Sequence, residues 1–177
     1  TPRTSSAASD VYKRQSACSL PPVSIKPFLI NEIENQTKKL ALALKVKGFM
    51  NVQYAIKKDK IYVIEVNPRA SRTVPFVSKA KNLPLAKIAS RIMAGEKLTK
   101  FNLKSKTKGM FAVKEAVFPF NKFPNSDLLL GPEMKSTGEV MGFDKNFGMA
   151  FAKSQIAASN SLPKKGLAFI YLKNSHK

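Results

Sequence analysis

Two short runs of alternating apolar and polar residues most constrain what this chain can fold into. They are FMNVQYAI, residues 49–56, and IYVIEVN, residues 61–67. Such period-two patterns predict two strands, each with one apolar face. A hairpin brings these faces together in one register only, because a slip of one residue sends every side chain to the opposite side. The expected pairs are Val52 with Val66, Tyr54 with Ile64 and Ile56 with Tyr62, with a three-residue turn at 58–60.

The polar face of this predicted hairpin gathers oxygen-bearing side chains. The same register places Gln53 opposite Glu65 and Asn51 opposite Asn67, and directly opposed side chains have Cβ atoms roughly 4.5–5.5 Å apart. Carboxylate and amide oxygens suit Mg²⁺, which commonly takes one or two carboxylates and completes its shell with phosphate oxygens. We therefore predict that Gln53, Glu65 and Asn67 form a magnesium-nucleotide site. A hairpin whose polar face is simply solvated would show the same pattern.

Two arginines follow the second strand within VIEVNPRASRTVPF, residues 63–76. We expect this stretch to begin as a buried strand and to end as an extended segment that contains proline. Arg69 and Arg72 can hold an anion by forked hydrogen bonds. Phosphoryl transfer requires divalent ions to screen the phosphates and cations to hold an anionic acceptor. The sequence thus favours a phosphoryl-transfer site.

The remaining elements are predicted from periodicity and from helix-stopping residues. Helices are expected at 27–47, where Gly48 is the stop, at 84–95, and from Phe147 to about residue 155. Strands are expected at 110–118 and 166–173, whereas 119–142 is punctuated by Pro and Gly. Glu115, Glu133 and Glu139 are interpreted as structural residues.

The composition narrows the class of protein. The chain of 177 residues has 44% hydrophobic residues, enough for a core, and a net charge of +20. The positive charge comes mainly from dispersed lysines, whereas nucleic-acid surfaces favour clustered arginine; a basic nucleic-acid-binding module is therefore kept only as an alternative. Cys18 is the single cysteine, which fits a reducing, cytoplasmic setting. No apolar run in the sequence reaches the ~18–20 residues of a membrane helix.

Several motifs in the same order give a family resemblance. IEVNPRASRTVPFVSKA, with SACSLPP upstream and KEAVFPFNKFP and LLGPEMKSTGEVMG downstream, resembles the large chain of carbamoyl phosphate synthase. The RTVPF and SACSLPP segments resemble its second, carbamate-phosphorylating half. Biotin-dependent carboxylases share the shorter E-x-N-P-R element but continue differently after the arginine. Another ATP-grasp ligase of that type remains the nearest alternative.

The resemblance implies a fold and a role for each matching residue. It implies an α+β chain that forms the C-terminal part of an ATP-grasp fold, an antiparallel sheet with packed helices. It also implies that Gln53 and Glu65 bind ATP-bound Mg²⁺ or Mn²⁺, that Asn67 is a further metal ligand, and that Arg69 and Arg72 position carbamate and the transferred phosphate. The implied partner is a glutamine amidotransferase small chain, in a higher oligomer that serves arginine and pyrimidine biosynthesis. No nucleic acid or membrane is expected as a partner.

The resemblance also suggests boundaries within the chain. We expect a disordered or artefactual leader at 1–15, a partial C-terminal ATP-grasp lobe at 16–95, and the rest of the synthesising region at 96–158. Residues 159–177 would be a linker and the first strand of an α/β, methylglyoxal-synthase-like allosteric domain. The family's His-Ser-Gly-Asp motif is replaced by residues 11–15. We therefore expect a fragment that has no activity alone.

Overall fold

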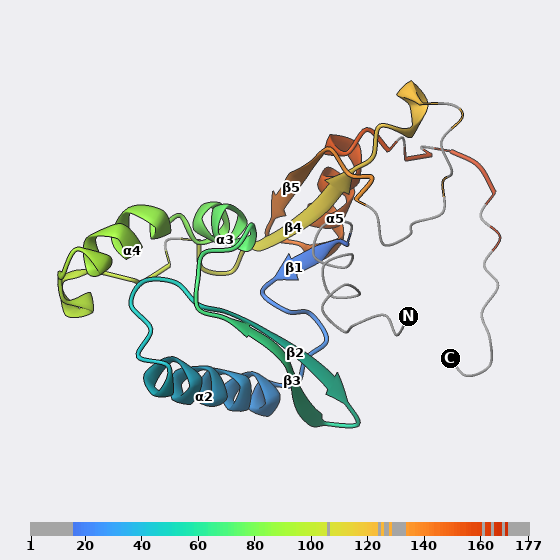
Figure 1. Ribbon diagram of the computed structural model, residues 1–177. Helices are drawn as coiled ribbons and strands as arrows, with labels where there is room; N and C mark the ends of the chain where they lie inside the picture. Colours follow the sequence, from blue (N-terminus) through green and yellow to red (C-terminus); the bar gives the residue numbers. More distant parts are fainter. Residues whose placement is uncertain are drawn as a thin grey trace.

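The computed structural model contains two antiparallel sheets with helices packed against them (Figure 1). It describes residues 16–105, 107–123, 125, 128, 134–160, 162, 163, 165–167 and 169. In the described part, one sheet has three strands in the order β1-β4-β5, and the other is the hairpin β2-β3. The expectation of an antiparallel sheet with packed helices is confirmed.

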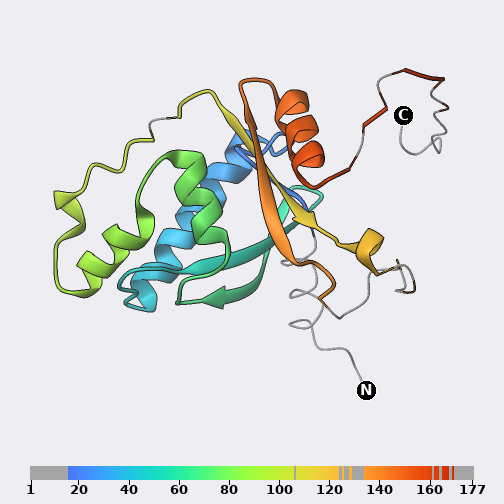
Figure 2. The ribbon, with the colours of Figure 1, turned by 90° about the horizontal axis from the view of Figure 1, so that it is seen from above.

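The three-stranded sheet lies between two helices (Figure 2). Its central strand β4 (Phe111–Val117) pairs with β1 (Cys18–Leu20) and with β5 (Gly138–Asp144). One face packs on α3 (Thr73–Lys81), where Phe76, Ala80 and Ala112 form a buried cluster. The other face packs on α5 (Phe147–Ala157), where Ala150 is completely buried. This sandwich holds most of the buried apolar residues of the described part.

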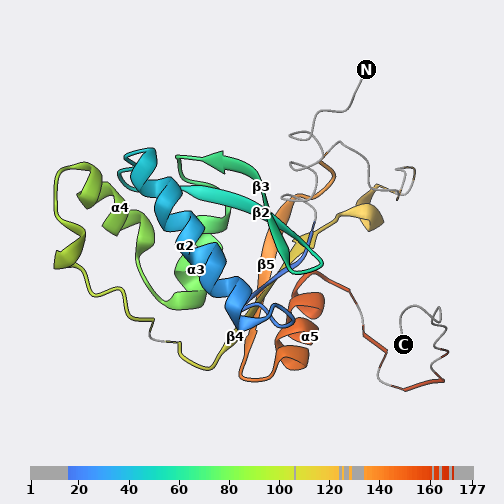
Figure 3. The same ribbon diagram turned by 90° about the horizontal axis from the view of Figure 1, so that it is seen from below.

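The hairpin joins β2 (Asn51–Lys57) to β3 (Lys60–Asn67) and lies beside α2 (Pro27–Ala43), as Figures 1 and 3 show. Thr37 of α2 and Tyr54 of β2 share a hydrogen bond of 2.8 Å between their hydroxyl oxygens. This bond lies on the face of β2 opposite Gln53, since successive side chains of a strand alternate. The helix therefore covers one face of the hairpin and leaves the Gln53 face turned away from it.

The predicted register of the β2-β3 hairpin is confirmed from Asn51 to Gln53 and is wrong from Tyr54 to the turn. Asn51–Asn67, Val52–Val66 and Gln53–Glu65 pair as expected, but a bulge follows Gln53 and Tyr54 pairs with Val63 instead of Ile64. The turn has two residues, Lys58 and Asp59, with φ of 49° and 60°. Positive φ at both positions is the type I′ geometry that matches strand twist. This turn is one residue shorter than predicted, and Ile64 becomes the extra residue of a bulge.

The segment after the hairpin corrects another expectation. Residues 73–76 begin helix α3 and are not extended. Pro75 is the third residue of the helix. The N–H group that proline lacks would have no intrahelical acceptor there, so the proline is compatible with a first turn. Asn82 ends α3 in the left-handed conformation, with φ of 49°. The prediction that this stretch begins as a buried strand is also wrong at its first residue, because Val63 is 48% exposed.

The other boundaries differ from prediction by small amounts. Helix α2 stops at Ala43, four residues early, because Lys45 has a φ of 50°. Helix α4 (Leu85–Met93) and strand β4 lie inside their predicted ranges. Two short 3₁₀ turns, η1 (Leu98–Lys100) and η2 (Phe120–Lys122), were not predicted.

The C-terminal side of the chain has one strand that was not predicted, and one predicted strand that lies largely outside the described residues. Strand β5 was not predicted, since the stretch before Gly142 looked like a loop. The strand predicted at 166–173 lies outside the described residues, apart from Gly166, Leu167 and Phe169, which are not assigned to a strand. Among the described helices, none is long and apolar enough to cross a membrane.

Candidate functional site

The two neighbouring strands of the hairpin bring three predicted ligands together. Gln53 on β2 lies directly opposite Glu65 on β3. The Nδ2 group of Asn67 donates a hydrogen bond of 2.9 Å to Oε1 of Glu65. All three residues are partly buried. The hydrogen bond orients the Asn67 amide so that its Oδ1 atom stays available as an acceptor.

The bulge lies immediately beside this cluster. Gln53 and Glu65 form the last regular pair before the register shifts at Tyr54. Bulges increase local twist and re-aim side chains, and they are common beside active sites. The shift leaves the pairing of these three predicted site residues intact. It changes only the outer half of the hairpin, where Tyr62 moves to the face of Ala55.

The two predicted arginines follow on the connection between β3 and α3, and both are exposed. The backbone N–H of Arg69 donates to the carbonyl of Asn67 at 2.8 Å, which turns the chain sharply after the ligands. The Arg69 guanidinium donates to the Ala70 carbonyl at 3.0 Å. Arg72 directly precedes α3, and its Nη1 atom lies 3.6 Å from Sδ of Met134. Both guanidinium groups thus leave donors directed to solvent.

The donor set fits a hard divalent cation. One carboxylate and two amide oxygens are typical ligands of Mg²⁺, which keeps other positions for water and phosphate oxygens. Within the described ranges, no group of three or more His, Cys, Asp or Glu side chains could enclose a metal ion by itself. A cation at this face would therefore complete its shell with water or phosphate oxygens, and a metal-nucleotide complex provides both.

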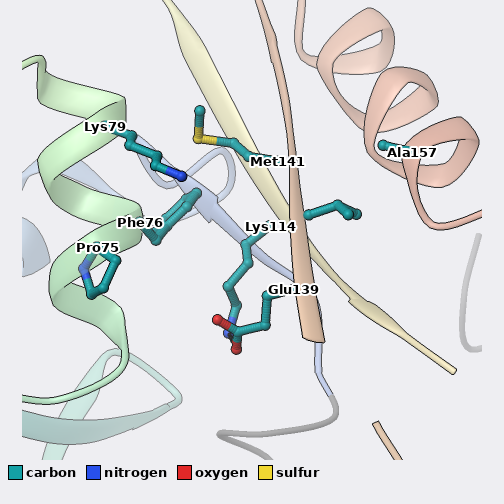
Figure 4. Close-up of a pocket in the computed structure, with 8 residues that line it drawn as sticks. Pro75, Phe76, Lys79, Lys114, Glu139, Met141 and Ala157 are labelled. Carbon is teal, nitrogen blue, oxygen red and sulfur yellow. Dashed lines mark hydrogen bonds and ion pairs between the residues drawn. The ribbon is translucent and has the colours of Figure 1, made fainter. Parts of the chain in front are cut away.

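A second group of charged residues lies between α3 and the three-stranded sheet (Figure 4). Lys114 of β4 is buried, and its Nζ atom lies 2.7 Å from Oε1 of Glu139 on β5. Phe76 and Lys79 of α3 line the same cavity of about 450 Å³. Sequence reasoning missed this ion pair, because its partners are 25 residues apart and β5 was not predicted.

The contacts of Glu115 and Glu139 test the interpretation of three acidic residues as structural. Oε2 of Glu115 accepts a hydrogen bond of 2.7 Å from Gln155, which links β4 to α5. Glu139 belongs to the ion pair described above. Both contacts agree with a structural role, whereas Glu133 lies outside the described residues.

The sequence matches a known family over more than half of its length. Residues 8–101 match the model of the carbamoyl-phosphate synthase L chain, ATP binding domain. The chain belongs to this family. The match includes the hairpin and both arginines, so the candidate site lies within an ATP-binding domain of carbamoyl phosphate synthase type.

Curated relatives carry the same family name. A carbamoyl phosphate synthase large chain of Archaeoglobus fulgidus is 57% identical over 168 residues, which are 94% of this chain and 16% of the relative. One from Methanobrevibacter smithii is 58% identical over 170 residues, with the same shares. A "large chain, C-terminal section" of Aquifex aeolicus is 49% identical and covers 90% of this chain and 33% of the relative. The chain therefore spans about a sixth of the full-length large chains it matches.

A solved structure confirms the ATP-grasp type of fold. The ADP complex of N5-carboxyaminoimidazole ribonucleotide synthetase superposes with a TM-score of 0.58 over 81% of this chain and 40% of that one. The identity is 16%, so the likeness shows the fold alone.

Proposed function

We propose that this chain is part of an ATP-dependent ligase, the large chain of carbamoyl phosphate synthase, and that its hairpin serves the phosphorylation of carbamate. One observation carries the proposal: Gln53, Glu65 and Asn67 share one face of a hairpin, with Gln53 opposite Glu65 and Asn67 bonded to it. The relative named as a C-terminal section supports the second half of the large chain. The RTVPFVSKA continuation supports the same half.

The five side chains divide into two groups with different tasks in this proposal. Gln53, Glu65 and Asn67 hold a divalent ion, Mg²⁺ or Mn²⁺, which when bound neutralises the phosphate oxygens of ATP. Arg69 and Arg72 hold carbamate and the γ-phosphoryl group in line. A carbamate oxygen then bonds to the γ-phosphorus as the bond to the β-phosphate oxygen breaks, which yields carbamoyl phosphate and ADP. The arginines stabilise the charge on the transferred group.

The wider setting is proposed from the family. Carbamate would come from another part of the large chain, with ammonia supplied by a glutamine amidotransferase small chain. The product would serve arginine and pyrimidine biosynthesis in the cytoplasm, in a higher oligomer. The size of this chain relative to the large chains supports the proposal that it is inactive alone.

The test uses a full-length large chain that contains this segment. Glu65→Gln keeps the size and the hydrogen-bonding shape of the side chain but removes its charge. We expect ATP-dependent carbamate phosphorylation to fall by about 10²-fold or more, since a ligand charge is lost from the phosphate-screening site. A matched control is Glu34→Gln on the exposed side of α2, which should leave turnover unchanged. Unchanged turnover of Glu65→Gln at saturating Mg²⁺ would remove Glu65 from the mechanism.

The arginines are tested separately. Arg72→Ala should lower kcat or raise KM for the acceptor and leave KM for ATP almost unchanged, because the guanidinium is assigned to the acceptor side. The comparison variant Arg72→Lys keeps the charge but loses the fork, so it should recover only part of the rate. Full activity of Arg72→Ala would assign Arg72 to the protein surface.

A further inference from the structure

We propose that this chain binds a phosphate-bearing anion at a second site, in the cavity between the C-terminal end of α3 and the loop that leads to β4. The cavity has a volume of about 490 Å³. It is lined by Pro21, Lys81, Lys104, Ser105, Thr107, Lys108, Gly109, Met110 and Phe111. None of these residues belongs to the hairpin site.

The described lining of the cavity is positively charged. Lys81, Lys104 and Lys108 face the cavity, and no acidic residue lines it. None of the three forms an ion pair with another described residue, in contrast to Lys26, Lys114 and Lys153. Cations that share a concave surface repel one another and concentrate anions there. An anion of two or more charges would relieve this repulsion.

Hydrogen bonds hold the loop of the cavity against α3. The Thr107 hydroxyl donates to the carbonyl of Ala80, and the Ser105 hydroxyl donates to the carbonyl of Lys81 at 3.4 Å. The two hydroxyl oxygens also lie 3.1 Å apart. These bonds hold Ser105 and Thr107 against α3 before any ligand arrives. Less conformational freedom is then lost on binding.

The structural role of the helix end accounts for only part of the charge. A lysine in the last turn of a helix is favourable because the unpaired carbonyl groups carry partial negative charge, and this explains Lys81 at the end of α3. Lys104 and Lys108 lie on the loop, beyond any helix. Their place on the same cavity wall is what points to a ligand.

A neighbouring cavity extends the positive surface. It has a volume of about 500 Å³, shares Lys104 and Ser105 with the first, and adds Lys87 and Arg91. Arg91 is already engaged, since its guanidinium donates to both carboxylate oxygens of Glu96 at 2.5 and 2.7 Å. Lysine ammonium groups bind phosphate as point charges. Phe111 and Met110 add an apolar wall to the first cavity, which leaves room for an organic group attached to the phosphate.

The experiment titrates pyrophosphate into the 177-residue chain without divalent metal, by calorimetry. We expect saturable binding at one site. Lys104→Gln with Lys108→Gln should weaken it by about tenfold or more, since two of three cations are lost. The control is Lys57→Gln with Lys60→Gln, a pair across the end of the hairpin with the same change in net charge. The control pair should change Kd by no more than about twofold, because exposed charges beyond a Debye length of ~8–10 Å are screened.

The site is located independently by backbone amide chemical shifts. Pyrophosphate should shift the amide signals of Thr107 and Gly109. Shifts confined to residues near Arg69 and Arg72 would overturn the proposal, because the anion would then occupy the hairpin site. The absence of saturable binding would overturn it as well. So would an equal loss of pyrophosphate affinity in the Lys104/Lys108 variant and in the Lys57/Lys60 control. None of these measurements uses carbamate phosphorylation as its readout, so failure of this proposal can be told apart from failure of the proposed function.

Discussion

Gly142 of β5 packs directly against the backbone of α5, and this contact gives the sharpest test of the fold. A Cβ atom added at Gly142 would lie 1.9 Å from the carbonyl oxygen of Ala150 and 2.5 Å from the backbone nitrogen of Ser154. Both neighbours belong to α5 and are completely buried. Because the obstacles are backbone atoms, no change of rotamer can make room for a methyl group.

The cost of Gly142→Ala follows from this geometry. Helix α5 would have to withdraw by about 1.5 Å to change a 1.9 Å approach into an ordinary contact of 3.4 Å. Withdrawal would separate α5 from Val113, which is only 2% exposed. Overpacking a core costs about 1–3 kcal/mol and occasionally more. We expect a loss of about 3 kcal/mol in the free energy of unfolding.

The matched control lies on the same strand. Gly138 has no atom within 4 Å of the corresponding Cβ position, so Gly138→Ala should be neutral, or stabilising by about 0.5–1 kcal/mol. Urea and thermal unfolding followed by circular dichroism would compare the two variants. The expected loss corresponds to roughly 6–12 °C in Tm for a chain of this size. If the two variants differ by less than about 0.5 kcal/mol, the close packing of β5 on α5 is refuted.

Three further predictions address the ion pair, the turn and the pH dependence. Lys114→Met should destabilise the chain by about 1–2 kcal/mol, because Glu139 loses its partner while its carboxylate stays accessible to water. An apolar replacement of both residues should restore part of this loss in urea unfolding, and no recovery would contradict the reasoning. Lys58 has a φ of 49°, a conformation that Asn tolerates and β-branched residues do not. Lys58→Asn should therefore stabilise the chain by about 0.5–1 kcal/mol, and Lys58→Val should destabilise it. The opposite order of the two Tm values would argue against the type I′ turn. Hydrogen bonds from Arg91 lower the pKa of Glu96, so the stabilisation is present above the unfolded pKa of about 4.3 and is lost as pH falls through the lower folded value. The acid limb of a stability-pH curve should therefore be shallower in Arg91→Gln, and identical curves would exclude the pair as a contributor.

Much of the candidate site could be predicted from the sequence. Alternation in two nearby runs predicted a hairpin, and the coincidence of apolar faces predicted that Gln53 would lie opposite Glu65, as it does. Helix α4 was also predictable, since its apolar stripe is regular and Gly95 follows with a φ of 102°. These features depend on residues close in sequence, where side-chain period and local φ preferences dominate.

The errors have a different physical origin. The turn length could not be predicted, because Lys58 and Asp59 lack the Asn-Gly signal for a type I′ turn. Pro75 suggested extended chain, yet proline is tolerated in the first turn of a helix, and packing of Phe76 on the sheet favours α3. Strand β5 was missed because Gly142 reads as a loop residue, although glycine is the residue type that permits the approach of α5.

The sequence alone therefore determined several of the local elements, the residue pairing at the candidate metal-nucleotide site and the family. The tertiary structure decided which elements meet: Lys114 with Glu139 across two strands, Gly142 with the backbone of α5, and three lysines around one cavity. The reason is that periodicity and φ preferences act over a few residues. Contacts between separate elements are set by how sheets and helices close around a shared core, and neither period nor propensity encodes that closure.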